Sequence, residues 1–265
     1  MNKITVTTLK EKKTNREPIT VLTVYDYTFA KILDQAGVEV LLVGDSLGMV
    51  MLGHPNTLPV TLENMIVHTQ AVARGAQHAL IITDMPFMTY QINEEEAVRN
   101  AGRLVQEGKA EGVKIEGGQV IAGAVRRIVS AGIPVMGHIG LTPQSIHTIG
   151  GYKIQGKSKD ATDRLLADAK ALEEAGCFSL VLECVPAAFG EEVSKALSIP
   201  VIGIGAGPKC DGQVLVMHDL LGLYPNLRPK FVKRFADLGE LAEKAVRNYV
   251  EEVKSGKFPS QEQSF

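Results

Sequence analysis

Ionisable side chains close a series of short apolar segments in this chain. They are Asp45 after Leu-Leu-Val-Gly, Asp84 after Leu-Ile-Ile-Thr, Glu116 after Val-Lys-Ile, His138 after Val-Met-Gly, and Glu183 after Leu-Val-Leu. Carboxylates and imidazoles are groups that bind cations and transfer protons in enzymes. If the apolar segments are parallel strands of one barrel, their C-terminal ends meet on one face. The pattern therefore predicts a single acidic site at that face.

Each of these residues could have a structural role when it is taken alone. An Asp after a strand is a good N-cap for the following helix or a turn former, and a lone His at a strand end is often structural. That explanation fits Asp45, Asp84 and Glu116 less well together, because three crowded carboxylates repel one another unless a cation or protons neutralise them. Oxygen ligands without a His or Cys cluster favour Mg²⁺ or another hard cation over zinc.

Two residues extend this hypothesis to a substrate and a base. Lys114 precedes Glu116 by two positions, so both side chains point the same way from a strand. A fixed ammonium group beside a metal suits an anionic substrate such as a keto acid. Glu183 is the candidate general base, because apolar surroundings would raise its pKa towards neutral pH, and helix capping is its structural alternative.

The elements that must position these residues alternate in type. Short segments rich in Val and Ile are each followed by a longer segment with helical periodicity, which is the pattern of repeated βαβ units. Because the strands are continuously apolar, we expect helices on one side of them and a filled barrel interior on the other. This predicts a (β/α)8 TIM barrel, with a doubly wound open sheet as the alternative. The expected strands are residues 19–25, 39–43, 79–83, 112–115, 134–137, 179–182 and 201–204, with 214–217 as a less certain eighth.

The expected helices carry recognisable end signals. Thr61 and Asn93 are candidate N-caps, and Gly37, Gly132 and Gly176 stand where helix C-caps belong. We find no linker, so residues 1–265 are expected to form a single barrel with C-terminal helices, the last of which wraps the outside. The expected helices cover residues 28–36, 61–74, 94–107, 118–131, 161–175, 187–197 and 238–253.

Length and composition narrow the class of protein. The 265 residues, 45% of them hydrophobic and 22% charged, match the roughly 250 residues of one α/β barrel. A formal net charge of −2 gives no basic surface for nucleic acid. Apolar runs end far short of the ~20 residues that span a bilayer. Residues 1–8 lack the apolar core and the cleavage site of a secretory signal, so we expect no such signal here. Three cysteines without C-x-x-C spacing fit a reducing cytoplasm.

One glycine-rich segment could contact a ligand. Ile-Gly-Ile-Gly-Ala-Gly at 202–207 follows an expected strand, but it matches the dinucleotide-binding fingerprint only weakly. We interpret it as a place where the backbone approaches a ligand closely, and a tight turn is the alternative.

Several longer motifs together resemble the ketopantoate hydroxymethyltransferase family, over nearly the whole chain. They are Thr-Val-Tyr-Asp-Tyr (23–27), Val-Gly-Asp-Ser-Leu-Gly (43–48), residues 53–61, Asp-Met-Pro-Phe (84–87), Val-Lys-Ile-Glu-Gly (113–117), Gly-His-Ile-Gly-Leu-Thr-Pro-Gln (137–144), Leu-Glu (182–183) and the glycine-rich segment. The resemblance implies a Mg²⁺-dependent barrel of the phosphoenolpyruvate mutase/isocitrate lyase type. It also implies a cytoplasmic homodecamer that acts in pantothenate and coenzyme A biosynthesis.

The resemblance further implies roles for individual residues. Asp45, Asp84 and Glu116 would surround the metal, directly or through water. Asp45, Ser46, Asp84 and Lys114 would contact the keto acid. Glu183 would accept a proton from 3-methyl-2-oxobutanoate, giving a Mg-stabilised enolate that attacks the one-carbon unit of the co-substrate 5,10-methylenetetrahydrofolate. His138 could hydrogen-bond the new hydroxyl group. The sequence holds no linear motif for the folate.

Two other functions remain possible at this point. A Mg²⁺-dependent C–C lyase or phosphonomutase of the same barrel superfamily would share the metal and keto-acid site, but it should carry a Lys-Lys-Cys-Gly-His loop, which this sequence lacks. A non-catalytic small-molecule-binding barrel would need a degenerate site, whereas the metal ligands, the lysine and the candidate base are all present.

Overall fold

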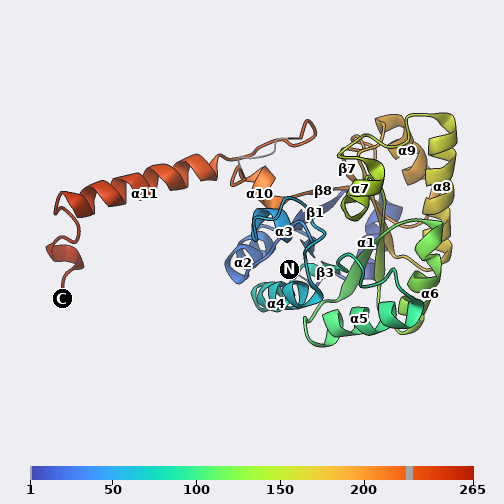
Figure 1. The fold of residues 1–265 in the computed structure, drawn as a ribbon, viewed down its shortest axis with the longest axis horizontal. Helices are drawn as coiled ribbons and strands as arrows, with labels where there is room; N and C mark the ends of the chain where they lie inside the picture. Colours follow the sequence, from blue (N-terminus) through green and yellow to red (C-terminus); the bar gives the residue numbers. More distant parts are fainter. Residues whose placement is uncertain (1, 225–228) are drawn as a thin grey trace. The chain divides into compact units, whose positions relative to one another are not determined.

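The computed structural model describes residues 2–224 and 229–265, and the chain divides into two compact units, Met1–Val216 and Met217–Phe265. In the first unit, each strand pairs in parallel with the next, and β1 pairs with β8 to close a barrel (Figure 1). The closure confirms the predicted barrel and excludes the open sheet. The strands of the described residues are β1 (Ile19–Thr23), β2 (Val40–Val43), β3 (Leu80–Asp84), β4 (Gly112–Glu116), β5 (Val135–Gly140), β6 (Ser179–Glu183), β7 (Val201–Ile204) and β8 (Gly212–Leu215).

Strand β8 begins two residues before the position expected for it. Its first residue, Gly212, pairs with Ile19 of β1 and lies so close that a Cβ atom there would be 2.4 Å from the Ile19 carbonyl oxygen. A residue without a side chain is therefore needed where β8 closes the barrel.

Helices surround this barrel, as Figure 1 shows for α5, α6 and α8. The predicted N-caps are confirmed, since the Thr61 side chain accepts a hydrogen bond from the Asn64 amide and the Asn93 side chain from the Glu96 amide. Gly37, with a φ of 85°, follows a helix end in the left-handed conformation. The helices of this unit are α1 (Val6–Asn15), α2 (Tyr27–Gln35), α3 (Leu47–Val50), α4 (Leu62–Gly75), α5 (Glu94–Gln106), η1 (Gln119–Ile121), α6 (Ala122–Ser130), η2 (Pro143–Ser145), α7 (Ile146–Ile149), α8 (Lys159–Glu174) and α9 (Ala187–Ala196).

Helix α1 is absent from the sequence-based expectation. Its Thr- and Lys-rich sequence has one buried residue, Leu9, so it shows no apolar periodicity. Leu9 packs in the core with the inward-facing strand residues, and Ile4 and Val6 pack against the same cluster. Thr5 and Thr8 form a capping box that starts the helix. The N-terminal segment thus covers the end of the barrel where the strands begin.

A set of ion pairs, here called the basal ring, fixes that segment to the strand beginnings. Its pairs are Lys3–Glu111 at 2.6 Å, Lys12–Glu39 at 2.6 Å and Lys13–Asp211 at 2.7 Å. Each acid immediately precedes a strand and also accepts a hydrogen bond from a backbone amide of the neighbouring strand. These amides belong to Ile81 (2.9 Å, to Glu111), Thr20 (2.7 Å, to Glu39) and Val201 (2.8 Å, to Asp211).

The second unit contains α10 (Met217–Leu220), α11 (Leu238–Lys254) and η3 (Gln261–Gln263). Helix α11 confirms the helix expected at 238–253, and none of its residues is buried in the described structure. Its expected place around the outside of the barrel, and the expectation of a single domain, stay predictions. Among the described residues, no helix combines the length and the apolar character needed to cross a bilayer.

Candidate active site

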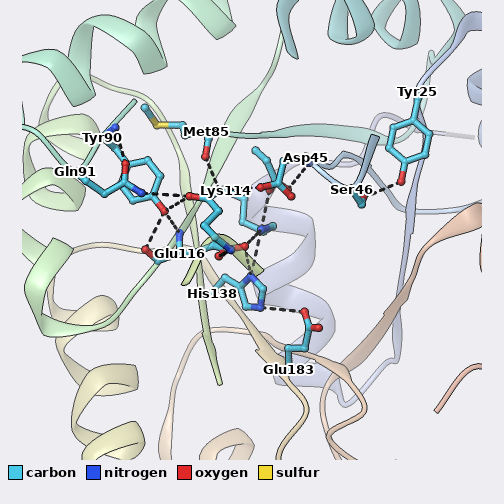
Figure 2. A network of polar contacts seen from close by, with 12 residues as sticks. Tyr25, Asp45, Ser46, Met85, Tyr90, Gln91, Lys114, Glu116, His138 and Glu183 are labelled. Carbon is cyan, nitrogen blue, oxygen red and sulfur yellow. Dashed lines mark hydrogen bonds and ion pairs between the residues drawn. The ribbon is translucent and has the colours of Figure 1, made fainter. Parts of the chain in front are cut away.

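The predicted residues meet at the C-terminal end of the barrel strands, as Figure 2 shows. Asp84 and Glu116 are the last residues of β3 and β4, and Asp45 lies two residues beyond β2. Strand register explains their neighbours, because Asp84 pairs with Lys114 and Glu116 pairs with His138 across adjacent strands. These five side chains are each at most 6% exposed. The prediction that these strand-end residues converge is therefore confirmed.

Asp45, Asp84 and Lys114 form one half of the group. The Asp45 amide donates to Asp84 Oδ2 at 3.0 Å, and Lys114 Nζ forms an ion pair with Asp84 Oδ1 at 2.8 Å. Lys114 Nζ also lies 3.9 Å from Glu116 Oε1. One ammonium group therefore lies between two carboxylates, in a site that excludes most solvent.

Glu116, His138 and Glu183 form the other half. His138 Nδ1 lies 3.3 Å from Glu116 Oε1, and His138 Nε2 lies 3.3 Å from Glu183 Oε2. The imidazole thus bridges the buried Glu116 and the Glu183 side chain, which is 15% exposed. Because Glu183 contacts this ring, its surroundings are not the purely apolar ones that the sequence suggested.

Burial and mutual repulsion set the charge states of this group. Burial, then the charges of Asp84 and Glu116, hold the pKa of Asp45 well above its usual value. Burial opposes charge on Lys114, yet the three carboxylates around it raise its pKa. Burial and the Lys114 charge also oppose protonation of His138, but its contacts with the carboxylates of Glu116 and Glu183 prevail and raise its pKa to about 9. Lys114 and His138 are therefore both cationic at neutral pH.

His138 Nδ1 also lies 3.3 Å from Lys114 Nζ, and the two contacts of this nitrogen cannot both be hydrogen bonds. Lys114 has only donors, so Nδ1 could accept from it only in a neutral ring. The raised pKa of His138 favours the charged ring, in which Nδ1–H donates to Glu116. Glu116 in turn has a lowered pKa, because the His138 hydrogen bond and nearby positive charges outweigh its burial.

Ser46 follows Asp45 but hydrogen-bonds elsewhere. Its Oγ lies 2.8 Å from the Tyr25 hydroxyl, which donates to Thr23 Oγ1 at 2.7 Å. Gly44 makes room for this arrangement, since a Cβ atom there would lie 2.7 Å from Ser46 Oγ and 3.6 Å from Asp84 Oδ2. Ser46 therefore lies beside the acidic group without a hydrogen bond to it in the described structure.

The glycine-rich segment at 202–207 is explained by packing. A Cβ atom on Gly207 would lie 2.5 Å from Ala187 Cβ, and Gly190 of α9 lies against the Ala206 carbonyl oxygen. Gly205 and Gly207 have positive φ values of 61° and 84°. These contacts show that the segment forms a tight turn, and the close approach of its backbone to a ligand stays a prediction.

The match to a known family covers almost the whole chain. The family described as ketopantoate hydroxymethyltransferase matches residues 3–261. This chain belongs to the ketopantoate hydroxymethyltransferase family. It is 56% identical to 3-methyl-2-oxobutanoate hydroxymethyltransferase of Syntrophus aciditrophicus (strain SB), over 99% of this chain and 97% of the relative. The protein of that name from Enterococcus faecalis (strain ATCC 700802 / V583) is also 56% identical, over 99% of this chain and 96% of the relative. The protein is therefore a hydroxymethyltransferase, as predicted.

Solved structures with low sequence identity share the fold. A phosphonopyruvate hydrolase in complex with oxalate and Mg²⁺ superposes with a TM-score of 0.64 at 14% identity, over 99% of this chain and 93% of that one. A 2,3-dimethylmalate lyase of the phosphoenolpyruvate mutase/isocitrate lyase superfamily gives 0.62 at 18%, over 98% and 88%. The barrel of this hydroxymethyltransferase family member thus shares its fold with these structures.

The acidic group of this family member has donors that fit a hard cation. Asp84 Oδ1 is buried and, in the described part of the chain, has no hydrogen bond of regular geometry beyond its ion pair with Lys114. Among the described residues, no group of three or more His, Cys, Asp or Glu side chains is placed to hold a metal ion. Mg²⁺ is commonly held by one or two carboxylates, with water and substrate in its other positions. Asp45 and Asp84 suit that arrangement, and both oxygens of Asp84, like both oxygens of Glu116, also contact protein groups.

Two residues that sequence reasoning missed also line this site. Gln144, in the loop after β5, is 5% exposed and hydrogen-bonds Asp45 and Glu116. Tyr90, in the loop after β3, is 2% exposed and hydrogen-bonds the Glu116 backbone. Gln144 ends the Gly-His-Ile-Gly-Leu-Thr-Pro-Gln motif, so the motif marked its position without indicating its role. For Tyr90, no sequence signal indicated a place in the site.

Proposed function

We propose that this enzyme transfers a hydroxymethyl group from 5,10-methylenetetrahydrofolate to 3-methyl-2-oxobutanoate. The product is 2-dehydropantoate (ketopantoate), an intermediate of pantothenate and coenzyme A biosynthesis. Relatives at 53% to 56% identity are named for this keto acid, which supports it as the substrate. The structural observation that carries the proposal is the buried Lys114 ammonium between Asp84 and Glu116, next to Asp45 and across from Glu183.

Substrate binding follows from the charges of the site. Asp45 and Asp84 would hold Mg²⁺, with Glu116 acting on it through water, in keeping with the Mg²⁺ of the phosphonopyruvate hydrolase complex. When bound, Mg²⁺ would supply a Lewis acid that makes the carbon next to the keto group more acidic. Lys114 adds a fixed positive charge for the keto acid. Ser46 and Asp84 complete the contacts to the substrate.

Glu183 removes the proton from the branched carbon of the keto acid, and the C–H electron pair moves towards the keto oxygen. Glu183 suits this role because its carboxylate is less buried than the other acids of the group, and the His138 ring orients it from one side. Lys114 stabilises the negative charge that develops on the substrate.

The carbon–carbon bond forms when the resulting carbanion attacks the one-carbon unit of the folate, and one of the two carbon–nitrogen bonds of that unit breaks with its electron pair going to the folate nitrogen. Hydrolysis of the second carbon–nitrogen bond then releases the hydroxymethyl product and tetrahydrofolate, so that the net reaction consumes one water molecule. His138 donates a hydrogen bond to the new hydroxyl group through Nε2, the nitrogen that faces Glu183. The same nitrogen is buried and has no regular hydrogen bond in the described structure.

The test of this function is product analysis. The protein is mixed with the keto acid, 5,10-methylenetetrahydrofolate and Mg²⁺, and each component is then omitted in turn. We expect ketopantoate only in the complete mixture. No ketopantoate in the complete mixture would overturn the proposal, and cleavage of a keto acid without folate would favour the lyase alternative.

We also propose that the enzyme acts in the cytoplasm as a homodecamer, on the strength of the family resemblance. Light scattering during size-exclusion chromatography tests the assembly. A mass of one or two chains at micromolar concentration would contradict it.

A further inference from the structure

Gln144 joins the acidic group from a loop that crosses several strand ends. It lies in η2 (Pro143–Ser145), just after β5, and its side chain reaches residues that follow β2 and β3. Its Nε2 donates to Asp45 Oδ2 at 2.9 Å and to the Met85 carbonyl oxygen at 3.0 Å. Its Oε1 accepts from the Tyr90 hydroxyl at 2.8 Å and from Gln91 Nε2 at 3.2 Å.

These four partners determine the orientation of the carboxamide. Both partners of Nε2 are acceptors, and both partners of Oε1 are donors. The reversed amide would place its oxygen against the Asp45 carboxylate and its NH₂ group against the Gln91 amide nitrogen. The side chain therefore has a single favourable orientation, with each of its hydrogen-bonding positions occupied.

The same residue also holds Glu116. The Gln144 backbone amide donates to Glu116 Oε2 at 3.0 Å, and the Glu116 amide donates to the Tyr90 hydroxyl at 3.1 Å. Gln144 thus occupies one oxygen of each carboxylate, and the Tyr90 hydroxyl contacts the Glu116 backbone. Glu116 Oε1 remains directed at Lys114 and His138. Figure 2 shows Tyr90, Gln91 and Met85 on the opposite side of the group from Glu183.

We propose that Gln144 is a positioning residue that fixes the Asp45 carboxylate, together with Glu116, in the geometry that binds the divalent cation. Tyr90 supports it by holding the carboxamide in its one favourable orientation. This inference rests on the metal of the proposed function. It goes beyond that function because it assigns the control of cation affinity to an uncharged residue. This residue lies in the loop after β5, whereas Asp45 and Asp84 lie at the ends of β2 and β3.

The substitution Gln144→Met tests the proposal with little change in side-chain length. Methionine has no amide, so Asp45 Oδ2 and the Met85 carbonyl oxygen each lose a donor while the volume stays filled. Loss of a residue that orients a metal ligand typically weakens metal binding by about 10- to 100-fold. We expect the dissociation constant of Mn²⁺, measured by electron paramagnetic resonance on the full chain without substrate, to rise by that factor.

A purely structural role for Gln144 makes a different prediction. Asp34→Asn is the matched control, because Asp34 is a buried carboxylate that accepts three backbone amides next to the beginning of β3, away from the acidic group. Both variants should unfold at lower temperature in metal-free buffer. The proposal expects Asp34→Asn to bind Mn²⁺ within about twofold of wild type.

Three results would overturn the inference. The first is Mn²⁺ binding by Gln144→Met within twofold of wild type, and the second is an equal loss of Mn²⁺ binding in Asp34→Asn. If Gln144→Met does not fold, Tyr90→Phe replaces it, and we expect this variant to bind Mn²⁺ about threefold more weakly than wild type, or weaker still. The third overturning result is unchanged Mn²⁺ binding by Tyr90→Phe. Wild type that binds no Mn²⁺ would instead refute the metal of the proposed function, so the two failures are distinguishable.

Discussion

Replacement of Asp34 should destabilise the barrel by an amount that depends on how many of its hydrogen bonds the new residue can keep. Asp34 Oδ2 accepts the Gln77 amide at 3.0 Å, and Oδ1 accepts the His78 and Ala79 amides at 3.0 and 2.7 Å. A hydrogen bond to a charged group contributes about 1.5 to 3 kcal/mol, and water can replace part of this at the exposed Gln77. We expect Asp34→Ala to lower the free energy of unfolding by about 3 kcal/mol, from the two bonds to Oδ1.

Asp34→Asn should cost less, because the amide oxygen can keep the Oδ1 bonds and only the bond to Gln77 is lost. We expect about 1 kcal/mol for this variant. Urea unfolding followed by far-ultraviolet circular dichroism at neutral pH gives both values. A loss below about 0.5 kcal/mol for Asp34→Ala would refute the argument that these three amides depend on this carboxylate.

The same group predicts a pH dependence. Burial opposes the charge of Asp34, but the three backbone amides outweigh it and lower its pKa. A carboxyl group whose pKa is lower in the folded state stabilises the fold above its unfolded pKa of about 3.9, and this contribution is lost as the pH falls through the folded value. The difference in stability between wild type and Asp34→Asn should therefore narrow below about pH 4. A difference independent of pH would contradict the assigned cause.

The remaining predictions concern the site and the base of the barrel. Glu183→Gln should slow exchange of the branched-carbon proton of 3-methyl-2-oxobutanoate with deuterated water by about 100-fold or more, and exchange at the wild-type rate would clear Glu183 of the role. Asp84→Ala should abolish metal-dependent activity without unfolding the barrel, and unchanged Mn²⁺ affinity would show that Asp84 is not a ligand. Lys13→Met should lower the free energy of unfolding by about 1 kcal/mol, since Lys13 forms a largely buried ion pair with Asp211 and also donates to the Ser194 carbonyl oxygen. Equal stability in urea would argue against that contribution.

Local patterns were sufficient to predict the barrel and the ionised members of the site. Asp84 and Glu116 each end an apolar strand, and the parallel arrangement brings such ends together whatever the details of the loops. Lys114 was predictable for the same reason, because alternation along β4 places it on the face of Glu116.

The missed features depend on contacts between distant parts of the chain. Gln144 reaches Asp45, 99 residues away, because the loop after β5 folds back over the ends of β4, β3 and β2. Nothing in the residues near Gln144 specifies that path. The contact between His138 and Glu183 likewise depends on the register of β5 and β6, and helix α1 lacked the apolar periodicity that would have revealed it.

The basal ring has a consequence for the order of assembly. Its acid-to-amide contacts join residues 19, 30 and 10 positions apart, so each can form once two successive strands exist. Two of its three lysine contacts span far more of the chain, with 108 positions between Lys3 and Glu111 and 198 between Lys13 and Asp211. During synthesis, Lys13 emerges early, but its carboxylate partner arrives only just before the last strand. The local contacts of the strand pairs can therefore form first, whereas the ion pair between Lys13 and Asp211 can complete the ring only once the segment that leads into β8 is present.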